Sequence, residues 1–406
     1  MLYQAYQAHE DLMWPYRTFA KAAIPVLEDN RLGTRDTRTM RSMAAACETF
    51  ALGSMTHRRP PFGIDTVKVG EREVAVREEE AGRTPFATLL HLKKDLDTWQ
   101  PAVLIVAPMS GHFATLLRET VRTMLADHDV YITDWHNARD VPLFAGPFGL
   151  DEYTEHIMGF TRTIGTGVHI VAICQPCVAA LAAVALMAED ADPATPASLT
   201  LMAGPIDCRI NPTAVNKLAA AKPIEWFEKN LIGRVPMRYA GAFRRVYPGF
   251  IQLSAFMNMN LERHMNAFRG YYESLAAGDL DKADATKNFY EEYFAVADLP
   301  AEFYLETVRQ VFQEYALPQG KLRHRGRRID PGAIRRTALL TVEGERDDIC
   351  GIGQTLAAQD LCVNLKQYLR THYIQAGVGH YGVFSGRRWN NHIYPVVRDV
   401  IHASGG

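Results

Sequence analysis

The chain has 406 residues, of which 48% are hydrophobic and 22% are charged, and its formal net charge is −2. This composition is typical of a soluble globular protein with a large core, and the near-neutral charge argues against a general nucleic-acid-binding protein. Six cysteines are too few for a disulfide scaffold and indicate a reducing, cytoplasmic setting. The N-terminus lacks the features of a signal peptide, and no run reaches the ~18 apolar residues of a membrane span.

The beginning of the chain predicts helices followed by edge strands. Residues 1–27 mix Leu, Met, Trp, Tyr and Phe with charged residues and predict an amphipathic helix, which we expect to pack on its own domain. Contact with an internal hydrophobic surface is the alternative role for this segment. Short alternating runs then predict antiparallel strands at the edge of a sheet, at Phe62–Val69, Val74–Glu80 and Ala87–Leu92.

A second pattern begins near residue 103, where short buried strands alternate with helices. We predict strands at Val103–Ala107, Val130–Thr133, His169–Ile173 and Leu199–Ala203, and helices at Thr115–Leu125, 151–164 and Val178–Glu189. Strands that alternate with helices form a mostly parallel, doubly wound sheet, so the predicted fold class is α/β.

The alternation stops between residues 211 and 331, a stretch rich in Phe, Tyr, Met and Arg in which we predict helices at Ala214–Leu231, Leu261–Ala276, Ala283–Ala295 and Glu302–Glu314. It resumes with strands at Ala338–Val342 and His372–Gln375 and helices at Thr355–Leu369 and Ile393–His402. We therefore predict a helical cap, residues 211–331, inserted into the sheet domain. Residues 1–210 would hold the N-terminal helices and the first part of the core, and residues 332–406 the remainder.

The most informative stretch is HIVAICQPC, residues 169–177, which an apolar helical run follows. A strand that stops at Cys174 and a helix that starts directly after it form the context of a nucleophile elbow, with cysteine where serine is usual. The local form Ala172-x-Cys174-x-Pro176 lacks both glycines of G-x-S-x-G. A nucleophile at such a turn stands clear of the sheet, beside helix N–H groups that can stabilise an oxyanion.

A cysteine nucleophile needs a base, and the base needs an orienting carboxylate. Strand 338–342 leads into a loop with Asp347 and Asp348, and strand 372–375 leads into a glycine-rich loop with His380. The order nucleophile, acid, histidine, each just past a strand, is that of α/β hydrolases. We therefore predict Cys174 as nucleophile, His380 as base and Asp347 as orienting acid, with Asp348 as the rival to Asp347.

The predicted oxyanion hole uses the backbone N–H of Gln175 and one N–H from the loop after strand 103–107, where Met109 is favoured by its position. In the same loop His112 is expected to be a pocket-wall or loop residue. Cys177, which follows the elbow, is expected to be a small core residue.

Other motifs lack the context that their function needs. Cys174-Gln-Pro-Cys177 has the C-x-P-C form of a thioredoxin redox site, but a thioredoxin unit leaves the acid and histidine loops unexplained. Gly377–Gly382 matches G-x-G-x-x-G, yet only 24 residues follow, too few for a dinucleotide-binding unit. Neither a second C-x-x-C nor a spaced His pair supports a zinc site. The basic run 321–328 is expected to be a solvated loop; its alternative is binding of an anionic surface or of a phosphate-bearing thiol.

With these residues in view, the chain resembles the intracellular polyhydroxyalkanoate (polyhydroxybutyrate) depolymerases over nearly its full length. The resemblance is densest at Ala107–Leu117, Cys174–Pro176, Gly204–Thr213, Glu343–Asp348 and Gly379–Gly382. It implies an α/β-hydrolase fold with a Cys-Asp-His triad at the matching positions, Cys174, Asp347 and His380. It also implies a bacterial cytoplasmic enzyme that acts on amorphous storage granules.

The expected reaction is cleavage of 3-hydroxyacyl esters through an acyl-cysteine, which water releases as 3-hydroxybutyrate monomers or oligomers. No metal or cofactor is expected; coenzyme A is an alternative acyl acceptor, with its phosphates on the basic run. The expected partners are the polyester and the granule surface, not nucleic acid, and a homo-oligomer is left open. A related polyester synthase, a thiol–disulfide enzyme and a non-catalytic granule-binding protein remain alternatives.

Overall fold

The computed structural model describes residues 2–29, 37–259 and 261–405, so residue 1 of the predicted N-terminal helix lies outside it. A nine-stranded sheet forms its centre, in the spatial order β1-β2-β3-β5-β4-β6-β7-β13-β14. All neighbouring pairs from β5 to β14 are parallel, whereas β1, β2 and β3 are added antiparallel at one edge. The strands are β1 (Thr66–Val69), β2 (Arg72–Arg83), β3 (Ala87–Lys94), β4 (Ala102–Val106), β5 (Asp129–Trp135), β6 (His169–Ile173), β7 (Ser198–Met202), β13 (Ala338–Gly344) and β14 (Arg370–Gln375).

Burial explains why these segments form strands in this order. Every residue of β6, β7 and β13 is buried, which matches their continuous apolar runs in a sheet that helices cover on both faces. The edge strand β2 instead alternates over part of its length between buried and exposed positions, because water reaches one of its faces. The prediction of an α/β fold with a mostly parallel sheet is confirmed.

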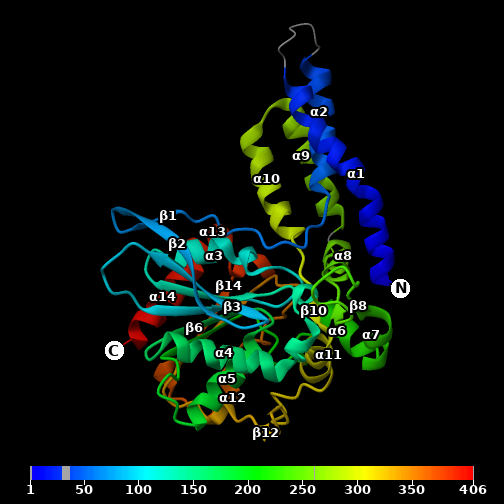
Figure 1. The fold of residues 1–406 in the computed structure, drawn as a ribbon. Helices are drawn as coiled ribbons and strands as arrows, with labels where there is room; N and C mark the ends of the chain where they lie inside the picture. Colours follow the sequence, from blue (N-terminus) through cyan, green and yellow to red (C-terminus); the bar gives the residue numbers. More distant parts are fainter. Residues whose placement is uncertain (1, 30–36, 260, 406) are drawn as a thin grey trace.

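Helices lie on both faces of the sheet. Figure 1 shows α4, α5 and α12 below the sheet and α3 and α13 above it. Helix α5 is buried along nearly its whole length, which is why it is apolar on every side. The bounds are α3 (Arg118–Met124), α4 (Leu150–Ile164), α5 (Cys177–Glu189), α12 (Ala357–Leu361), α13 (Gly386–Arg388) and α14 (Tyr394–Ser404). Shorter turns are 3-10 helices at Ala114–Leu117, Ala138–Asp140, Leu143–Ala145, Pro331–Ala333, Gln367–Leu369 and His380–Val383, and π-helices at Val308–Gln313 and Trp389–Ile393.

The predicted helix Thr355–Leu369 is wrong over most of its length, because regular α-helix covers only α12. The Arg370 guanidinium donates to the carbonyl oxygens of Gln359, Cys362 and Leu365, at 2.6–3.1 Å. These carbonyls therefore bind a side chain instead of continuing a helical ladder.

The chain between β7 and β13 lies outside the nine-stranded sheet. It contains α6 (Ala214–Ala221), α7 (Ile224–Leu231), α8 (Gly249–Met259), α9 (Leu261–Ala277), α10 (Leu280–Tyr293) and α11 (Ala301–Thr307). A small antiparallel sheet of β8 (Gly233–Arg234), β9 (Arg245–Tyr247) and β10 (Leu299–Pro300) and a hairpin of β11 (Arg323–His324) and β12 (Arg327–Arg328) complete it. The single helix predicted for 214–231 is two helices, because Pro223 at the junction has no N–H to donate.

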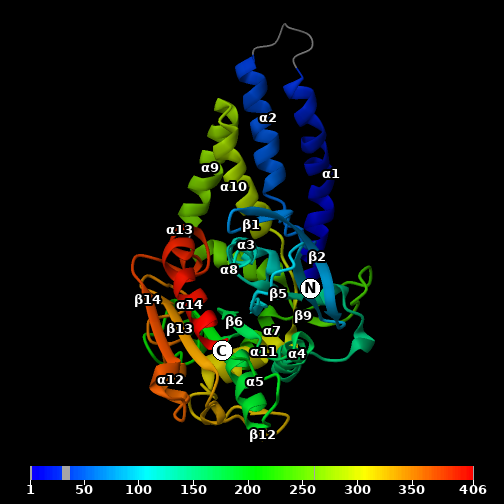
Figure 2. The same cartoon turned by 90° about the vertical axis from the view of Figure 1, so that its left-hand side faces the viewer.

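Four helices form an arm that projects from the body, and we call it the helical arm: α1 (Leu2–Glu28), α2 (Thr37–Leu52), α9 and α10 (Figures 1 and 2). Glu48 of α2 accepts hydrogen bonds from Tyr271 of α9 and Lys287 of α10, both at 3.0 Å. At the base of α1 the Tyr3 hydroxyl donates to the buried Asp298 carboxylate at 2.6 Å. Segments more than 200 residues apart in the chain thus share one arm.

Candidate active site

Cys174 lies in a sharp turn between the end of β6 and the start of α5. Its backbone φ is 67°, in the left-handed region that non-glycine residues rarely adopt. Its N–H donates to the carbonyl oxygen of Met202 at 2.7 Å, and its carbonyl oxygen accepts from the N–H of Cys177 at 3.2 Å. A strained residue held by its neighbours at a strand–helix junction is the geometry of a nucleophile elbow.

Gly204 permits this elbow to form without the two usual glycines. A Cβ atom at Gly204 would overlap the Cβ and Sγ atoms of Cys177 and lie 3.1 Å from the carbonyl oxygen of Cys174. The close approach that the elbow needs is therefore made by the segment after β7. Pro176 precedes the first residue of α5 with φ −68°, which suits a helix start.

His380 follows β14, and Asp347 follows β13, as predicted from the loops after these strands. The His380 Nδ1–H donates to Asp347 Oδ2 at 2.8 Å, and both side chains are buried. Asp347 Oδ1 accepts from the backbone N–H groups of Ile349 and Cys350 at 2.9 and 2.8 Å. Asp348 is exposed and lies in the wall of a cavity, so the geometry favours Asp347 as the orienting acid.

The His380 imidazole also interacts electrostatically with the Cys174 side chain. Burial alone would lower the pKa of His380, but the interactions with Cys174 and Asp347 outweigh it and hold the pKa well above its ordinary value. The structure thus brings the three predicted triad residues together, with His380 hydrogen-bonded to Asp347. A histidine that interacts with a cysteine on one side and a carboxylate on the other is the arrangement of a cysteine nucleophile with its base.

The loop after β4 carries the predicted oxyanion donor, Met109. Two residues before Met109, the carbonyl oxygen of Ala107 accepts hydrogen bonds from Trp135 Nε1–H at 2.8 Å and from the Tyr153 hydroxyl at 3.1 Å. These bonds fix the start of the loop. The N–H of Met109 donates to the side-chain Oε1 of Gln175 at an N···O distance of 3.3 Å. A substrate oxygen that used this donor would have to replace the Gln175 amide oxygen.

Two residues near the elbow for which the sequence predicts no catalytic role, His112 and Cys177, are structural. His112 is buried, its Nε2 lies 3.2 Å from the Tyr293 carbonyl oxygen, and burial lowers its pKa to about 4. Cys177 is fully buried and its thiol donates to the Ala172 carbonyl oxygen at 3.3 Å. Burial raises the pKa of Cys177, which makes it a poor redox partner for Cys174.

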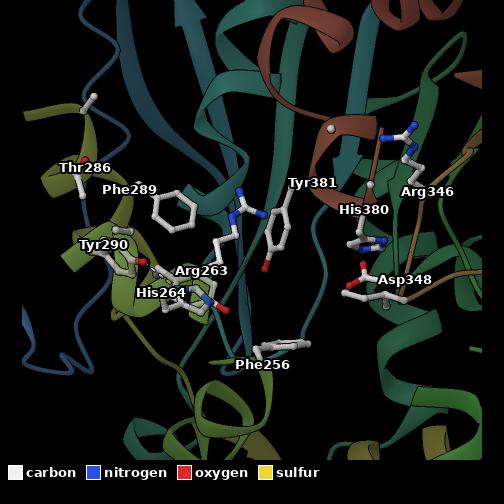
Figure 3. Close-up of a pocket in the computed structure, with 16 residues that line it drawn as sticks. Phe256, Arg263, His264, Thr286, Phe289, Tyr290, Arg346, Asp348, His380 and Tyr381 are labelled. Carbon is white, nitrogen blue, oxygen red and sulfur yellow. Dashed lines mark hydrogen bonds between the residues drawn. The ribbon is translucent and has the colours of Figure 1, made fainter. Parts of the chain in front are cut away.

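A cavity of about 670 Å³ opens beside His380, between the helical arm and the loops after β13 and β14. Figure 3 shows His380 and Asp348 on one side of this cavity and Arg263, Phe289 and Tyr290 of the arm on the other. Cys174 does not line it, so the cavity lies on the imidazole side of the triad. No spacing in the sequence indicates these arm residues, because they reach His380 only through the packing of helices onto the body. Its walls are Phe256, Arg263, His264, Ala267, Ala285, Thr286, Phe289, Tyr290, Tyr293, Arg346, Asp348, Ile349, Gly379, His380, Tyr381 and Gly382.

The basic run 321–328 lies in the β11–β12 hairpin, and two of its arginines are paired with acids of the body. Arg325 contacts Glu152 at 2.6 Å and Glu155 at 3.0 Å, and Arg327 contacts Glu189 at 2.7 Å. Figure 1 places this hairpin at the end of the body opposite the helical arm. The structure therefore gives no support to the alternative that this run holds the phosphates of a thiol acceptor.

No group of three or more His, Cys, Asp or Glu side chains in residues 2–29, 37–259 and 261–405 is arranged to hold a metal ion. None of the helices in these same ranges is long and apolar enough to cross a membrane.

Comparison with known families decides the assignment. The sequence model of the family described as PHB de-polymerase C-terminus matches residues 203–405, half of the chain. The chain belongs to this family. The resemblance seen in the sequence is thereby confirmed, and with it a carboxylic ester hydrolase of the α/β-hydrolase fold. The match includes the loops of Asp347 and His380, whereas Cys174 lies before it.

Three hydrolases are among the solved structures with a similar course of the chain. A 2-hydroxy-6-oxo-6-phenylhexa-2,4-dienoate hydrolase from Rhodococcus sp. strain RHA1 is 14% identical, with 81% of this chain and 99% of that chain covered and a TM-score of 0.43. A thermophilic esterase from Thermogutta terrifontis is 10% identical, with 84% and 98% covered and a TM-score of 0.40. A monoacylglycerol lipase from Paleococcus ferrophilus is 13% identical, with 75% and 96% covered and a TM-score of 0.41. No curated protein matches the chain.

Proposed function

We propose that this protein is an intracellular poly(3-hydroxybutyrate) depolymerase that uses Cys174, His380 and Asp347 as its catalytic triad. The observation that carries the proposal is the hydrogen bond between His380 and Asp347, with His380 interacting with Cys174 at an elbow where Cys174 has φ 67°. The family supplies the substrate class, a polyester of hydroxyacids. We further propose the division into a core of residues 1–210 and 332–406 and a cap of residues 211–331.

The proposed reaction proceeds in two acyl-transfer steps. The Cys174 thiolate attacks the ester carbonyl, and the oxyanion that forms accepts hydrogen bonds from the N–H groups of Met109 and Gln175. His380 then protonates the leaving alcohol oxygen as the carbon–oxygen bond breaks, which leaves a 3-hydroxyacyl thioester on Cys174. In the second step His380 removes a proton from water, the hydroxide displaces the thiolate, and a 3-hydroxy acid is released. Asp347 holds the imidazole orientation and stabilises its charged form.

Water and coenzyme A compete as acceptors in this scheme, since a thioester exchanges readily with a second thiol. We propose water as the acceptor. Arg325 and Arg327, which could have bound the phosphates of coenzyme A, are paired with carboxylates at the end of the body opposite the helical arm. A thiol–disulfide function is less well supported, because Cys177 is buried and directs its thiol into the core.

An insoluble polyester needs a docking face, and we propose one on α1. At about 100° per residue one face of this helix carries only apolar residues: Ala5, Ala8, Leu12, Pro15, Tyr16, Phe19, Ala23 and Val26. We call this face the α1 stripe. Leu12, Tyr16 and Phe19 are exposed by 63, 61 and 76%.

The charges of α1 fit a neutral polymer better than an anionic lipid surface. The helix has three carboxylates and two Lys or Arg side chains, whereas helices that lie on membranes are rich in cations. Arg17 pairs with Glu10 at 2.6 Å, so one of these two cations is already engaged. We therefore propose the storage granule of the cytoplasm as the partner of the α1 stripe.

The test is release of 3-hydroxybutyrate from amorphous polyhydroxybutyrate particles by wild-type protein, Cys174→Ala and Cys177→Ser, each with and without coenzyme A. We expect release by the wild type and by Cys177→Ser, and none by Cys174→Ala. Formation of 3-hydroxybutyryl-CoA would identify coenzyme A as the acceptor. Release by Cys174→Ala at the wild-type rate would refute the triad, and particle binding without any release would indicate a non-catalytic granule protein.

A further inference from the structure

The cavity beside His380 contains one more cation than its carboxylates can balance. Arg263 of α9 lies on one wall, and Arg346 and Asp348, from the loop after β13, lie on the other. His264 of α9 also lines the cavity. It is neutral, since burial lowers its pKa. With Arg346 and Asp348 of opposite charge, Arg263 is the excess cation of the cavity.

Arg263 has no protein partner in the described part of the chain. None of the ion pairs or side-chain hydrogen bonds there involves its guanidinium, although two other arginines of the helical arm and its base are paired: Arg269 with Glu273 at 2.9 Å and Arg17 with Glu10. In Figure 3 its guanidinium lies beside the Tyr381 ring. Burial raises the pKa of Tyr381, and the nearby Arg263 charge opposes that rise, as it does at Tyr290 and Tyr293.

The walls around Arg263 suit an acyl chain with a charged end. Phe256, Phe289 and Tyr293 supply apolar surface, and His264 Nδ1 lies 2.9 Å from the Tyr290 hydroxyl, which orients that hydroxyl. A cavity of about 670 Å³ is within the range of about 300–1,000 Å³ of small-molecule sites. The inner units of a polyester are neutral, so they would not require an arginine here.

The position of the cavity relative to the triad decides which part of the substrate it holds. His380 lines the cavity and Cys174 does not. In the proposed reaction His380 gives its proton to the leaving alcohol, so the group on the imidazole side is the alcohol portion of the ester. In a polyester of 3-hydroxy acids, the alcohol portion at the chain end carries the free carboxylate.

We propose that Arg263 binds the terminal carboxylate of the leaving hydroxy acid, so that the enzyme cleaves polyester and its oligomers from the carboxyl end. This inference rests on the proposed function and deepens it. Arginine is suited to the role because its planar guanidinium pairs with a carboxylate through two hydrogen bonds. Cleavage at this end releases 3-hydroxybutyrate monomer or short oligomers.

The test compares the linear 3-hydroxybutyrate dimer with its methyl ester, in which the terminal charge is removed and the scissile ester is kept. For wild-type protein we expect kcat/KM for the acid to exceed that for the methyl ester by about 10- to 100-fold, the effect of a hydrogen-bonded charge. Arg263→Gln should bring this ratio to within about twofold of one, and Arg263→Lys should retain part of it. Arg269→Gln, on the same helix but outside the cavity, is the matched control and should keep the wild-type ratio.

Binding measured without turnover separates this inference from the proposed function. The acid dimer is titrated calorimetrically into Cys174→Ala and into Cys174→Ala with Arg263→Gln, and we expect at least tenfold weaker binding by the second. If no protein cleaves either dimer but Arg263 still governs binding of the acid, the proposed function fails and the carboxylate site stands. If wild type cleaves both dimers equally and Arg263→Gln changes neither binding nor the ratio, the carboxylate site is overturned. Loss of coenzyme A-dependent release alone in Arg263→Gln would identify phosphate as the bound anion and overturn it as well.

Discussion

The orientation of His380 depends on one carboxylate oxygen. Asp347 Oδ2 accepts the His380 Nδ1–H, and Oδ1 is held by two backbone N–H groups, so Asp347 has a single rotamer that serves both. Asp347→Asn replaces the acceptor by an amide and removes the charge that stabilises the imidazolium. We expect kcat on a soluble 3-hydroxybutyrate ester to fall by about 10³- to 10⁴-fold.

Asp348→Asn is the comparison, because it leaves the bond between Asp347 and His380 in place. We expect a loss of less than about tenfold for this variant. Equal losses for the two variants would contradict the assignment of Asp347 as the orienting acid. Circular dichroism of both variants separates misfolding from a catalytic defect.

At the scale of single residues, the sequence predicted Cys174, His380 and the Asp347–Asp348 pair, because each follows a recognisable strand. Which of the two adjacent carboxylates turns inward depends on the N–H groups of Ile349 and Cys350, and no pattern of residue types shows this. Arg263 could not be predicted as a cavity residue, since its helix precedes His380 by more than 100 residues.

The elbow between β6 and α5 depends on the segment that follows β7. Gly204→Ala would place a methyl group against Cys177 and near the Cys174 carbonyl oxygen, so the turn must shift or the core must expand. We expect a loss of about 1–3 kcal/mol in the free energy of unfolding and a fall in kcat larger than any fall in substrate binding. Urea denaturation and steady-state kinetics measure the two effects.

Gly159→Ala in α4 is the matched control, because no heavy atom other than those of its chain neighbours and its own helix backbone lies within 4 Å of the position of its added Cβ. A helical glycine replaced by alanine in open space is expected to gain about 0.5–1 kcal/mol of stability. If Gly204→Ala behaves in the same way, the elbow does not depend on the close approach of Gly204.

The α1 stripe is a second element with a separate test. Leu12→Gln together with Phe19→Gln removes about half of its large exposed apolar side chains. Each such side chain is worth about 1.5–3 kcal/mol when it is fully buried, so we expect binding to polyhydroxybutyrate particles to weaken by at least tenfold. Particle hydrolysis should fall much more than hydrolysis of a soluble ester.

Phe144→Gln is the control for that variant, since Phe144 is 92% exposed but lies on the body in the turn 143–145. Particle binding should survive this change. Light scattering tests the competing explanation, that the α1 stripe binds a second copy of the chain. A dimer of the wild type and a monomer of the double variant would support that explanation.

At the scale of elements, the buried strands were predictable because their apolar runs are short and continuous. The failures occurred where a distant side chain or a single proline overrides periodicity: Arg370 ends the helix predicted for 355–369, and Pro223 divides that predicted for 214–231. The strands β8 and β9 have two or three residues and are too short to show any period. The helical arm could not be predicted either, since it joins α2 to α9 across more than 200 residues.

The whole molecule should lose stability in mild acid. Burial lowers the pKa of six histidines of the described residues: to about 3 for His57, to about 4 for His112, His128 and His169, and below the ordinary value for His156 and His264. Between pH 6.5 and about 4 the unfolded chain binds protons at these sites and the folded chain does not, so stability falls as the pH falls. Each site contributes up to about 1.4 kcal/mol per pH unit.

Asp298 opposes this trend, because burial raises its pKa to about 6 and the folded state then binds the extra proton. His380 opposes it too, since its pKa lies above the ordinary value. The six histidines outweigh these two groups, and we expect the free energy of unfolding to drop by at least about 3 kcal/mol from pH 7 to pH 5. Urea denaturation at the two pH values measures the difference. Equal stability at both would contradict neutral, buried histidines in the folded state.

The alternation of strands and helices made the α/β class predictable for the whole molecule. Buried strands that alternate with helices form a mostly parallel sheet, and the helices cover both of its apolar faces. The placement of the inserted segment against the N-terminal helices was not predictable. It depends on long-range contacts such as the bond between Tyr3 and Asp298, which no local pattern encodes.

The central claim is that Cys174 carries the acyl group during ester cleavage, and mass spectrometry of the trapped intermediate tests it most directly. The wild type and Cys174→Ala are mixed with an activated 3-hydroxybutyrate ester, quenched in acid within one turnover and digested. We predict the mass of one 3-hydroxybutyryl group on the peptide that contains Cys174, formed and lost at rates that match turnover, and no labelled peptide from Cys174→Ala. An acyl group on a different residue, or undiminished hydrolysis by Cys174→Ala, would contradict the account.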